Sequence, residues 1–402
     1  MRVCHVVYSY VPFDPRVQKE VSSLRLRGHE VDIVCLRDLG QPSVEDLERV
    51  RIHRVPLRAI RGGMFRYAYQ YATFFLLASL LLLRLQLQRR FNVVHVHSLP
   101  DFQIFCALPS KAFGASLILD MHEAMPEILA ARFELSMNHP LAKVACALEA
   151  LSGLIADRVL TVNSTIARLL EARGIDGRKL LVVMNSTDRP PSVSASPDDL
   201  LDRMALAGRT VIVYAGGVDP ERDLETVVRA AAILSKSRPV SLLIFGKGPE
   251  SYREELRGMV RNAPPMLDAR IGDWIPPAKA VELVSLTDVG LVPYRRNPLT
   301  EIAMPNKVFE YAAAGKPMVV ANLSTLRGLW ESSALFYEPG DELDLARKME
   351  RIVSQRDLAM RLVTSATAVY ERHTWAHYEA ELIHLYESLI QERRMGSSTF
   401  TS

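Results

Sequence analysis

The sequence predicts an α/β protein with two Rossmann-like domains, each a doubly wound parallel sheet. Short apolar, β-branched runs alternate with segments long enough for a crossover helix in both halves of the chain. This alternation is typical of a parallel sheet with helices on both faces. A chain of 402 residues is long for a single core, so two domains are expected.

The expected strands follow one another at crossover spacing. In the first half they are VCHVVYSY (3–10), EVDIVCL (30–36), VVHVHS (93–98), SLILDMH (116–122), RVLTVN (158–163) and LLVVMN (180–185). In the second half they are TVIVYAGG (210–217), SLLIFGKG (241–248), ARIG (269–272), VGLVPY (289–294) and PMVVAN (317–322). After LFYEPGDELD (335–344) the chain is expected to be helical to about residue 392.

A stretch rich in Pro, Ser and Asp separates the two halves and predicts a linker over 190–205. The expected domains are therefore 1–189 and 206–375, followed by a helix over 376–392 and a disordered tail over 393–402. Two such domains are expected to face a deep cleft, with ligands outside the carboxyl ends of the strands.

Composition excludes several classes of protein. The net charge is +3 and the Lys and Arg residues are scattered among nearly as many acids, so nucleic-acid binding is not indicated. Cys4, Cys35, Cys106 and Cys146 lie far apart without a Cys-x-x-Cys pair, which is typical of free thiols in a reducing cytosol. The amino-terminal strand does not resemble a signal peptide. A cytoplasmic protein is expected.

One apolar stretch, 67–83, is flanked by arginines on both sides. It is shorter than the roughly 20 apolar residues of a bilayer span, so a span is not expected. We expect a helix buried in the protein, and peripheral membrane contact through 58–90 is the alternative.

Common catalytic and cofactor motifs are missing. The stretch AAAGKP lacks the first glycine and the Ser or Thr of a Walker loop, and no Gly-x-Gly-x-x-Gly or Gly-x-Ser-x-Gly follows a strand. His95 and His97 share one face of a strand without a third ligand at close spacing, which favours packing or hydrogen bonding over a metal site. No metal is predicted.

Polar residues gather where the strand before Met121 ends. A strand of four apolar residues ends in Asp120, and His122, Glu123 and Glu127 follow it at the edge of the sheet where ligands bind. We interpret them as a polar wall for a hydroxyl-rich ligand, with His122 as its functional residue. A plain turn with capping acids is the alternative.

In the second half, Gly216 and Gly217 end a strand, and a helix is expected to begin near Pro220 or Glu221. Small residues admit a ligand to the backbone, while a helix start and Arg222 offer positive charge, which together predict an anion site. A tight turn with a surface arginine is the alternative.

The stretch AMPNKVFEYAAAGKP extends this anion site to a nucleotide. Pro305 suits the first turn of a helix, and Asn306 and Lys307 place donors at its positive end. Glu310 lies one turn later, about 5 Å along the axis. Because a carboxylate accepts two hydrogen bonds from a vicinal diol, a diphosphate at the helix start would bring its ribose to Glu310.

These segments, taken in order, resemble the family 4 glycosyltransferases of the GT-B architecture, over nearly the whole chain. The matching segments are FDPRVQKEVSSLRLRGHEVDIV, NVVHVHS, LDMHE, VVMNSTD, YAGGVDPERDLETVVRAA, LLIFGKGPE and PNKVFEYAAAGKPMVVAN. The last resembles the donor-site helix of one subgroup, written PNKxFEY. The resemblance implies sugar transfer from a nucleotide donor with retention of configuration and without a metal, and a carboxyl-terminal helix that crosses back to the first domain.

The resemblance also implies roles for residues of this chain. His122 would lie near the donor sugar, Arg222 and Lys307 on the diphosphate, and these three are the expected catalytic residues. Glu310 would bind the ribose. The other expected donor-site residues are Gly216, Gly217, Gly246, Trp274, Ile275, Met304, Pro305 and Asn306, with Trp274 and Ile275 against the nucleobase. Asp14, Arg16 and Glu123 are expected on the acceptor side.

Three positions depart from the family pattern. Ile302 stands where the first glutamate of the Glu-x7-Glu motif is expected, and Glu301 is one residue out of register. Gly217 replaces an arginine of the pyrophosphate loop. Asp14 and Pro15 replace a glycine pair, and are expected to be the N-cap and first residue of a helix.

The expected donor is a UDP-sugar, with a GDP-sugar next, and no cofactor is expected because the nucleotide-sugar is a substrate. The expected acceptor is a glycan or lipid-linked glycan at the cytoplasmic membrane face, in polysaccharide or glycolipid synthesis. A nucleotide-sugar epimerase of the same fold and a non-catalytic nucleotide-sugar-binding partner are the alternatives.

Overall fold

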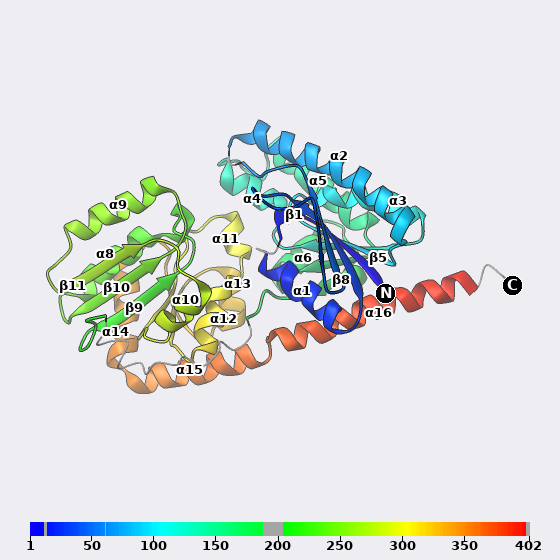
Figure 1. Cartoon of the computed structure of the whole chain (residues 1–402). Helices are drawn as coiled ribbons and strands as arrows, with labels where there is room; N and C mark the ends of the chain where they lie inside the picture. The colour runs from blue at the N-terminus through cyan, green and yellow to red at the C-terminus, as the bar shows by residue number, and fades with distance from the viewer. Residues whose placement is uncertain (12–13, 61, 188–203, 399–402) are drawn as a thin grey trace. The chain divides into compact units, whose positions relative to one another are not determined.

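The computed structural model describes residues 1–11, 14–60, 62–187 and 204–398, in two compact units. Unit 1 comprises Met1–Asn185 and Ala376–Ser402, and unit 2 comprises Ser186–Trp375 (Figure 1). Most of the predicted linker over 190–205 lies outside the described residues.

Unit 1 contains one eight-stranded sheet in the order β3-β4-β2-β1-β5-β6-β7-β8. The strands are β1 (Arg2–Tyr10), β2 (Glu30–Leu36), β3 (Val44–Leu47), β4 (Val50–Val55), β5 (Val93–His97), β6 (Ser116–Met121), β7 (Arg158–Thr161) and β8 (Leu180–Val182). All neighbours are parallel except β3 and β4, which form an antiparallel pair. The six predicted strands are confirmed. The β3–β4 pair was not predicted because its charged residues obscure the apolar alternation.

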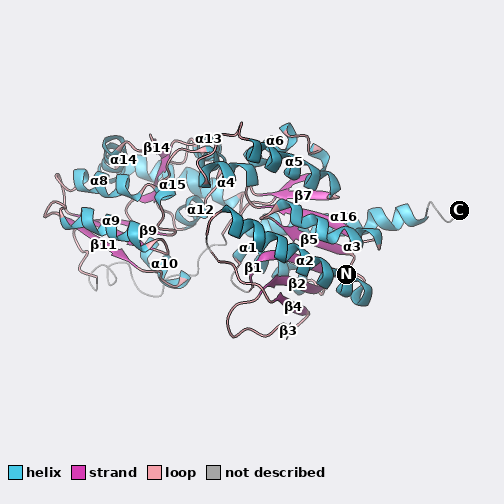
Figure 2. Cartoon of the chain, turned by 90° about the horizontal axis from the view of Figure 1, so that it is seen from above, coloured by secondary structure: helices cyan, strands magenta, loops and turns pink. Residues whose placement is uncertain are grey.

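Helices cover both faces of this sheet, as the crossover spacing predicts (Figures 1 and 2). They are α1 (Pro15–Leu26), α2 (Met64–Arg89), η1 (Asp101–Ala107), α3 (Leu108–Ala112), α4 (Met125–Arg132), α5 (Pro140–Ile155), α6 (Ser164–Ala172) and η2 (Gly177–Lys179). The Asp14 side chain caps α1 by accepting from the amides of Arg16 and Val17, and Pro15 is the first helical residue. The predicted cap is confirmed.

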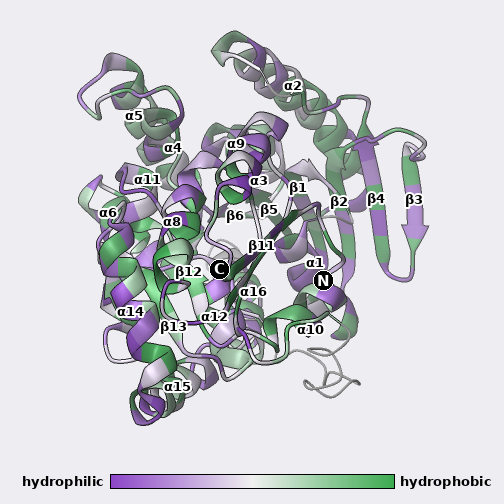
Figure 3. Cartoon of the chain, turned by 90° about the vertical axis from the view of Figure 1, so that its left-hand side faces the viewer, coloured by the Kyte–Doolittle hydropathy of each residue, from purple (hydrophilic) through white to green (hydrophobic). Residues whose placement is uncertain are grey.

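The expectation that the apolar stretch 67–83 is buried is wrong. It lies in α2, and only 28% of the most apolar window of this helix is buried. The buried side is a narrow stripe that includes Phe74, Ala78 and Leu82, because a helix can turn only one face toward the sheet. By length and composition α2 could also cross a membrane. Figure 3 shows that it is hydrophobic along most of its length.

Unit 2 contains two parallel three-stranded sheets, in the orders β11-β10-β9 and β12-β13-β14. The strands are β9 (Thr210–Ala215), β10 (Val240–Phe245), β11 (Leu267–Gly272), β12 (Gly290–Val292), β13 (Met318–Ala321) and β14 (Leu335–Tyr337). The five predicted strands form, and β14 was not predicted. The helices are η3 (Pro220–Arg222), α8 (Leu224–Leu234), α9 (Glu250–Arg261), α10 (Pro277–Val284), α11 (Pro298–Ile302), α12 (Asn306–Ala313), α13 (Ser324–Trp330), α14 (Glu342–Ser354) and α15 (Arg356–Glu371).

Side chains join the two sheets of unit 2 between β9 and β12. Thr287 Oγ1 and an Asp288 carboxylate oxygen accept hydrogen bonds from the amides of Val213 and Val211 in β9. Tyr311 of α12 donates its hydroxyl to the Val213 carbonyl at 2.9 Å. Gly290 at the start of β12 makes room for this ring, since a Cβ there would lie 2.6 Å from it. These side-chain contacts hold β9 of the first sheet beside β12 of the second.

The last helix, α16 (Trp375–Ser398), returns to unit 1, as the resemblance implies. Tyr386 contacts His95 of β5, and Arg393 Nε donates to Ser116 Oγ of β6 at 2.7 Å. The helix continues past residue 392, so the predicted disordered tail over 393–402 begins too early. Good helix formers over 389–394 carry the helix onward, and 399–402 lie outside the described residues.

Candidate functional site

A buried ion pair organises the carboxyl edge of the unit 1 sheet. Arg16, in the first turn of α1, donates from Nε and Nη2 to both carboxylate oxygens of Asp120 at 2.7 and 2.8 Å. Its Nη1 donates to the Val183 carbonyl and to Asn185, both at 2.8 Å. This bidentate pairing uses the donors of Arg16 within the protein, so the side chain predicted for the acceptor side holds β6 and the end of β8 instead.

His122 is positioned by this ion pair. Its Nε2 lies 3.0 Å from Asp120 Oδ2 and 3.1 Å from His97 Nδ1, and its side chain is 19% exposed. Burial alone would raise the pKa of Asp120, but Arg16 and His122 hold that pKa well below its usual range. The contact between His122 Nε2 and the Asp120 carboxylate sets the orientation of the imidazole ring. His122 therefore reaches the surface of unit 1 in a fixed orientation.

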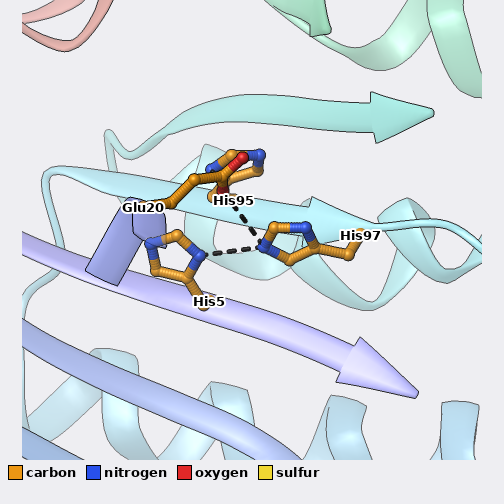
Figure 4. Close-up of side chains that lie close together, drawn as sticks. All are labelled: His5, Glu20, His95 and His97. Atoms are coloured by element: carbon orange, nitrogen blue, oxygen red, sulfur yellow. Dashed lines mark hydrogen bonds and ion pairs between the residues drawn. The ribbon is translucent and has the colours of Figure 1, made fainter. Parts of the chain in front are cut away.

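Behind His122 lies a fully buried cluster of His5, Glu20, His95 and His97 (Figure 4). His5 and His95 are neighbours in the register of β1 and β5, and His97 lies two residues further along the same face. His5 Nδ1 is 2.9 Å from His97 Nε2, and His95 Nδ1 is 2.6 Å from the Tyr386 hydroxyl. Burial lowers the pKa of all three histidines, which favours neutral rings.

The protonation state of Glu20 determines the net charge of this cluster. It lies one turn after Arg16, with Oε1 3.2 Å from Arg16 Nε, and its other oxygen is 3.7 to 3.8 Å from His95 and His97. Burial, together with nearby Asp120, raises the pKa of Glu20 well above its usual range. A protonated Glu20 leaves one cation and one anion, Arg16 and Asp120, so the cluster balances its own charge.

The same four side chains contain metal-ligand types, with candidate ligand atoms within 4.8 Å of one another. The nitrogens of His5 and His97 that face one another are already within hydrogen-bonding distance, and the rings of His95 and His97 stack at 4.4 Å. His5 Nε2, His95 Nε2 and both carboxylate oxygens of Glu20 are buried without a hydrogen-bond partner among the described residues, so the four side chains form only part of a hydrogen-bonded network. Sequence reasoning missed His5 and Glu20, although the spacing of Arg16 and Glu20 by four residues indicates one helix face.

The remaining unit 1 residues divide between surface and structure. Glu123 is exposed beside His122, where a ligand could reach it. One carboxylate oxygen of Asp14 accepts the hydrogen bonds that cap α1. Glu127, which the sequence places in the same polar wall, is buried against Arg173 instead, so this wall is shorter than predicted.

In unit 2, the predicted donor residues follow the carboxyl ends of parallel strands. Gly216 and Gly217 follow β9, Gly246 follows β10 and Trp274 follows β11, and these three strands pair in parallel. The carboxyl ends of parallel strands meet at one edge, so these loops lie at the same edge of the sheet.

Lys307 reaches back from the start of α12 to this edge. Its Nζ donates to the Ala215 carbonyl at the end of β9 and lies 4.9 Å from the centre of the Tyr214 ring. A Cβ on Gly216 would lie 2.6 Å from Lys307 Cε, so a larger residue at this position would displace the end of the lysine side chain. Burial and nearby Arg222 lower the pKa of Lys307, while Glu310 opposes this effect.

Arg222 lies on the other side of the Gly216–Gly217 turn. Its guanidinium stacks 4.5 Å from the centre of the Tyr294 ring, and its Nε is 3.6 Å from Asp219. A helix begins at Pro220 as predicted, but it is the short 3-10 helix η3, which ends at Arg222; Asp223, with φ of +48°, separates it from α8. The turn thus has two cations, Lys307 and Arg222, each with an acid no closer than 3.6 Å.

Glu310 lies one turn beyond Lys307, with Oε2 3.6 Å from Nζ and a 40% exposed side chain. The helix begins at Asn306, so Pro305 is the N-cap and not a residue of the first turn. Asn306 is exposed, whereas Met304 is half-buried. The carboxylate therefore stays accessible beside the two cations, as a ribose ligand requires.

The other predicted donor residues have mixed surroundings. A Cβ on Gly246 would lie 1.5 Å from the Gly216 carbonyl oxygen, so this glycine is explained by loop packing. Trp274 is 54% exposed, with Lys247 Nζ 5.2 Å from its ring, and Ile275 is half-buried. An exposed indole at this edge offers a flat apolar surface to a base.

Glu301, which is one residue out of register with the Glu-x7-Glu motif, is held by hydrogen bonds within unit 2. Glu301 accepts from the backbone amide of Ser324 at 2.9 Å and from its hydroxyl at 2.7 Å, and pairs with Arg296. It thus caps the first turn of α13 and is not free to hold a ligand.

Comparisons with known proteins agree with this architecture. Residues 14–186 match the family described as "Glycosyl transferase 4-like domain", and residues 209–355 match "Glycosyl transferases group 1". A Bacillus subtilis relative named for glycosyltransferase action in teichuronic acid biosynthesis, TuaH, is 31% identical over 38% of this chain and 38% of its own length. The chitobiosyldiphosphodolichol beta-mannosyltransferase of Candida glabrata is 20% identical over 81% of this chain and 77% of its own.

Solved structures share the fold at low sequence identity. Sucrose-phosphate synthase from Thermosynechococcus elongatus superposes with a TM-score of 0.77 at 16% identity, covering 97% of this chain and 99% of its own. Anabaena HepE in complex with UDP gives 0.73 at 13% identity, covering 96% of this chain and 100% of its own. The predicted fold class is confirmed. The chain has the fold of the GT-B glycosyltransferases, and its matches to a glycosyl transferase 4-like domain and then a group 1 domain indicate a glycosyltransferase.

Proposed function

We propose that this protein transfers a sugar from a nucleoside diphosphate donor, UDP-sugar first and GDP-sugar next, to a glycan or lipid-linked acceptor. One observation carries the proposal: Lys307 and Arg222 flank the Gly216–Gly217 turn, and Glu310 follows one helical turn later. Two cations with only distant acids suit a diphosphate, and an accessible carboxylate beside them suits a ribose diol.

The buried lysine also supports an anionic ligand. The charged form of Lys307 is disfavoured by burial and by Arg222, so the empty arrangement carries an electrostatic cost. A bound diphosphate would offset both effects. That the bacterial relative is named for teichuronic acid biosynthesis and that the solved HepE holds UDP support the polysaccharide context and the UDP donor.

In the proposed mechanism, Arg222 and Lys307 stabilise negative charge as the bond from the anomeric carbon to the diphosphate oxygen breaks. The acceptor hydroxyl attacks that carbon from the same face and gives its proton to the departing phosphate, so configuration is retained. Such preorganised charge is often the largest catalytic contribution, about 3 to 4 kcal/mol for one well-aimed donor. His122, oriented by Asp120, would bind a hydroxyl of the donor sugar.

Several finer features belong to this proposal. The chain would be a member of the PNKxFEY subgroup, and no metal or other cofactor would take part. It would act in the cytoplasm at the inner face of the membrane, in the synthesis of a polysaccharide or glycolipid.

A ligand comparison tests the ribose contact. Thermal-shift titration of the wild type with UDP-, GDP- and ADP-sugars identifies the base, and UDP is then compared with 2′,3′-dideoxy-UDP. Removal of the diol should weaken wild-type binding by about 10- to 100-fold, as expected for hydrogen bonds to a charged group. In Glu310→Gln the two nucleotides should bind with nearly equal affinity. Glu331→Gln, a 73% exposed glutamate of unit 2, is the matched control.

Equal affinity of the wild type for the two nucleotides would contradict the ribose contact. Consumption of a UDP-sugar without an acceptor, with an isomeric UDP-sugar as product, would indicate an epimerase. Tight UDP binding without turnover across glycan and lipid-linked acceptors would indicate a non-catalytic partner.

A further inference from the structure

α2 exposes an apolar stripe that the fold of unit 1 does not use. Its large exposed side chains are Phe65, Tyr69, Leu76, Leu80 and Leu87, from 60% to 92% exposed. Their spacing of four and seven residues places them on one face, opposite the buried stripe through Phe74, Ala78 and Leu82. The stripe is about 33 Å long. A soluble surface seldom exposes so much contiguous apolar area without a partner.

A second helix extends this surface. α5 exposes Leu141, Val144, Leu151 and Leu154, while its buried side faces the fold with Ala142 and Ala145. Both α2 and α5 contact η1, and Figure 3 shows both on the upper side of unit 1 with hydrophobic colouring. The apolar surface is thus wider than one helix.

The charged residues of α2 and the exposed charged residue of α5 have one sign. α2 contains no acidic residue, and its own charged residues are Arg66, Arg84 and Arg89. Exposed Arg58 precedes the helix and exposed Arg90 ends it. On α5, Lys143 is the exposed charged side chain, and the one acid, Glu149, is buried. A protein partner of ordinary composition does not explain arginines at both ends of the stripe, whereas a sheet of lipid phosphates does.

A pocket of about 940 Å³ opens at the amino-terminal end of α2. Its lining combines Arg37, Arg58 and Arg66 with the apolar side chains of Leu39, Ile60 and Tyr69. Asp38 is the one acid in the lining, so the basic residues are in excess. The N-cap residue, Gly63, provides no side-chain cap to the first turn, which leaves the positive end of the helix beside the pocket. Positive charge next to apolar side chains matches a phosphate with acyl chains attached.

We propose that unit 1 docks on an anionic lipid bilayer through the exposed faces of α2 and α5, with a lipid phosphate in the pocket of Arg37, Arg58 and Arg66. This deepens the proposed function, on which it rests for the membrane-bound acceptor, by naming the surface that meets the membrane. The apolar stripe lies at the boundary of head groups and acyl chains, parallel to the bilayer. α2 does not cross the bilayer, because its other face packs on β1, β2 and β4.

Vesicle binding of the full chain, without nucleotide, tests this proposal. Vesicles of phosphatidylcholine alone are compared with equimolar phosphatidylcholine and phosphatidylglycerol in a flotation assay. We expect binding to the anionic vesicles that weakens with salt. Leu76→Glu with Leu80→Glu should reduce the bound fraction at least about tenfold, because two carboxylates would enter the apolar boundary. Arg58→Glu with Arg66→Glu should abolish the preference for phosphatidylglycerol.

Matched controls keep the result specific. Leu343→Glu with Met360→Glu changes two exposed apolar residues of unit 2, and Arg178→Glu changes an exposed arginine of unit 1 away from α2. These variants should float like the wild type. Absence of wild-type binding to anionic vesicles, or equal loss in the controls, would overturn the proposal. A dimer in solution that Leu76→Glu with Leu80→Glu dissociates, with no vesicle binding, would assign the surface to a second copy and overturn it as well.

UDP binding, measured by thermal shift, separates this proposal from the proposed function. A chain that floats with anionic vesicles but binds neither UDP nor GDP retains the docking surface and loses the transferase proposal. A chain that binds UDP but does not float retains the donor site and loses the docking surface.

Discussion

The two candidate regions of this protein hold their charges in opposite ways. In unit 1, Arg16 and Asp120 form a bidentate pair, and the histidines behind them are buried, which lowers their pKa values and favours the neutral form. In unit 2, Lys307 and Arg222 have acids only at 3.6 Å, and Arg222 is 30% exposed. The Arg16–Asp120 pair in unit 1 is thus balanced within the protein, whereas the glycine turn in unit 2 has two cations without a close acid.

This difference indicates a division of work. A buried, balanced cluster fixes the orientation of one histidine and contributes little attraction to a distant anion. Two cations at a glycine turn attract and neutralise a diphosphate, and they are stabilised when it binds. Substitutions in unit 1 should therefore affect folding first, and those in unit 2 should affect turnover first.

The largest expected effect is on the stability of unit 1. Asp120→Ala leaves Arg16 buried without its anion and should lower the free energy of unfolding by about 3 to 5 kcal/mol. Trp274 and Trp330 lie within unit 2 and Trp375 is its last residue, at the start of α16, so tryptophan fluorescence follows mainly that unit. Hydrogen exchange of peptides from β5 and β6 in urea measures the loss in unit 1.

The control for Asp120→Ala is Glu48→Gln, which changes an 80% exposed acid of the same unit and should leave exchange unchanged. If Asp120→Ala shifts the tryptophan transition as far as the exchange in β5 and β6, the two units unfold together and the proposed contrast fails.

The next effect is on catalysis in unit 2. Arg222→Ala should lower turnover more than about a hundredfold, because it removes a charge aimed at the leaving diphosphate. The stability of Arg222→Ala should stay near that of the wild type, because Arg222 is partly exposed and its main contact is the stacking on Tyr294. Turnover with a UDP-sugar and the tryptophan transition in urea measure the two quantities in one protein.

Arg229→Ala, on the adjacent helix α8, is the matched control, because its side chain is 47% exposed and pairs with Glu342 only at 3.7 Å. Near-normal turnover of Arg222→Ala, or a loss of stability as large as that of Asp120→Ala, would remove the distinction between the two regions.

A smaller difference between the two units is expected in how their stability depends on pH. The pKa values of His5, His95 and His97 are lowered mainly by burial, so the unfolded chain binds more protons than the folded chain below about pH 6.5. The stability of unit 1 should therefore fall as pH decreases from about 6.5, by about 1.4 kcal/mol per pH unit for each histidine that stays neutral. The raised pKa of Glu20 acts in the opposite sense, which reduces the net slope.

Unit 2 contains a single histidine, His373, in its described residues, so its tryptophan transition should depend less on pH over this range. His5→Gln should flatten the slope of unit 1, measured by hydrogen exchange in β1 and β5 between about pH 5 and 7. Equal slopes for wild type and His5→Gln would show that the cluster does not titrate as its burial predicts.

The sequence predicts the fold better than the details of the site. Alternating strands and crossover segments carry the topology, and strand alternation places His95 and His97 on one face. It does not reveal that Arg16 turns inward to Asp120, because that pairing depends on how α1 meets β6. The same limit explains Glu301, whose capping of α13 is set by the relative positions of two short helices.

The apolar composition of 67–83 led to the wrong prediction that α2 is buried, and the reason is physical. An apolar stretch of this length indicates a helix that avoids water, and composition alone does not distinguish a protein core from a bilayer. How much of α2 is buried depends on how much of the helix surface the sheet covers. Here the sheet covers one narrow face and leaves Leu76 and Leu80 exposed.

The smallest expected effect concerns the support beneath the unit 2 site. Tyr311 fills the gap between β9 and β12, and its hydroxyl hydrogen-bonds the Val213 carbonyl at 2.9 Å. Tyr311→Phe keeps the ring and leaves that carbonyl without this donor, so it should cost about 1 kcal/mol in the tryptophan transition. UDP affinity should change less than about twofold, because Lys307 and Glu310 keep their helix. A loss of stability that approaches that of Asp120→Ala would mean that unit 2 also depends on a buried polar network, and the contrast would then lie in exposure alone.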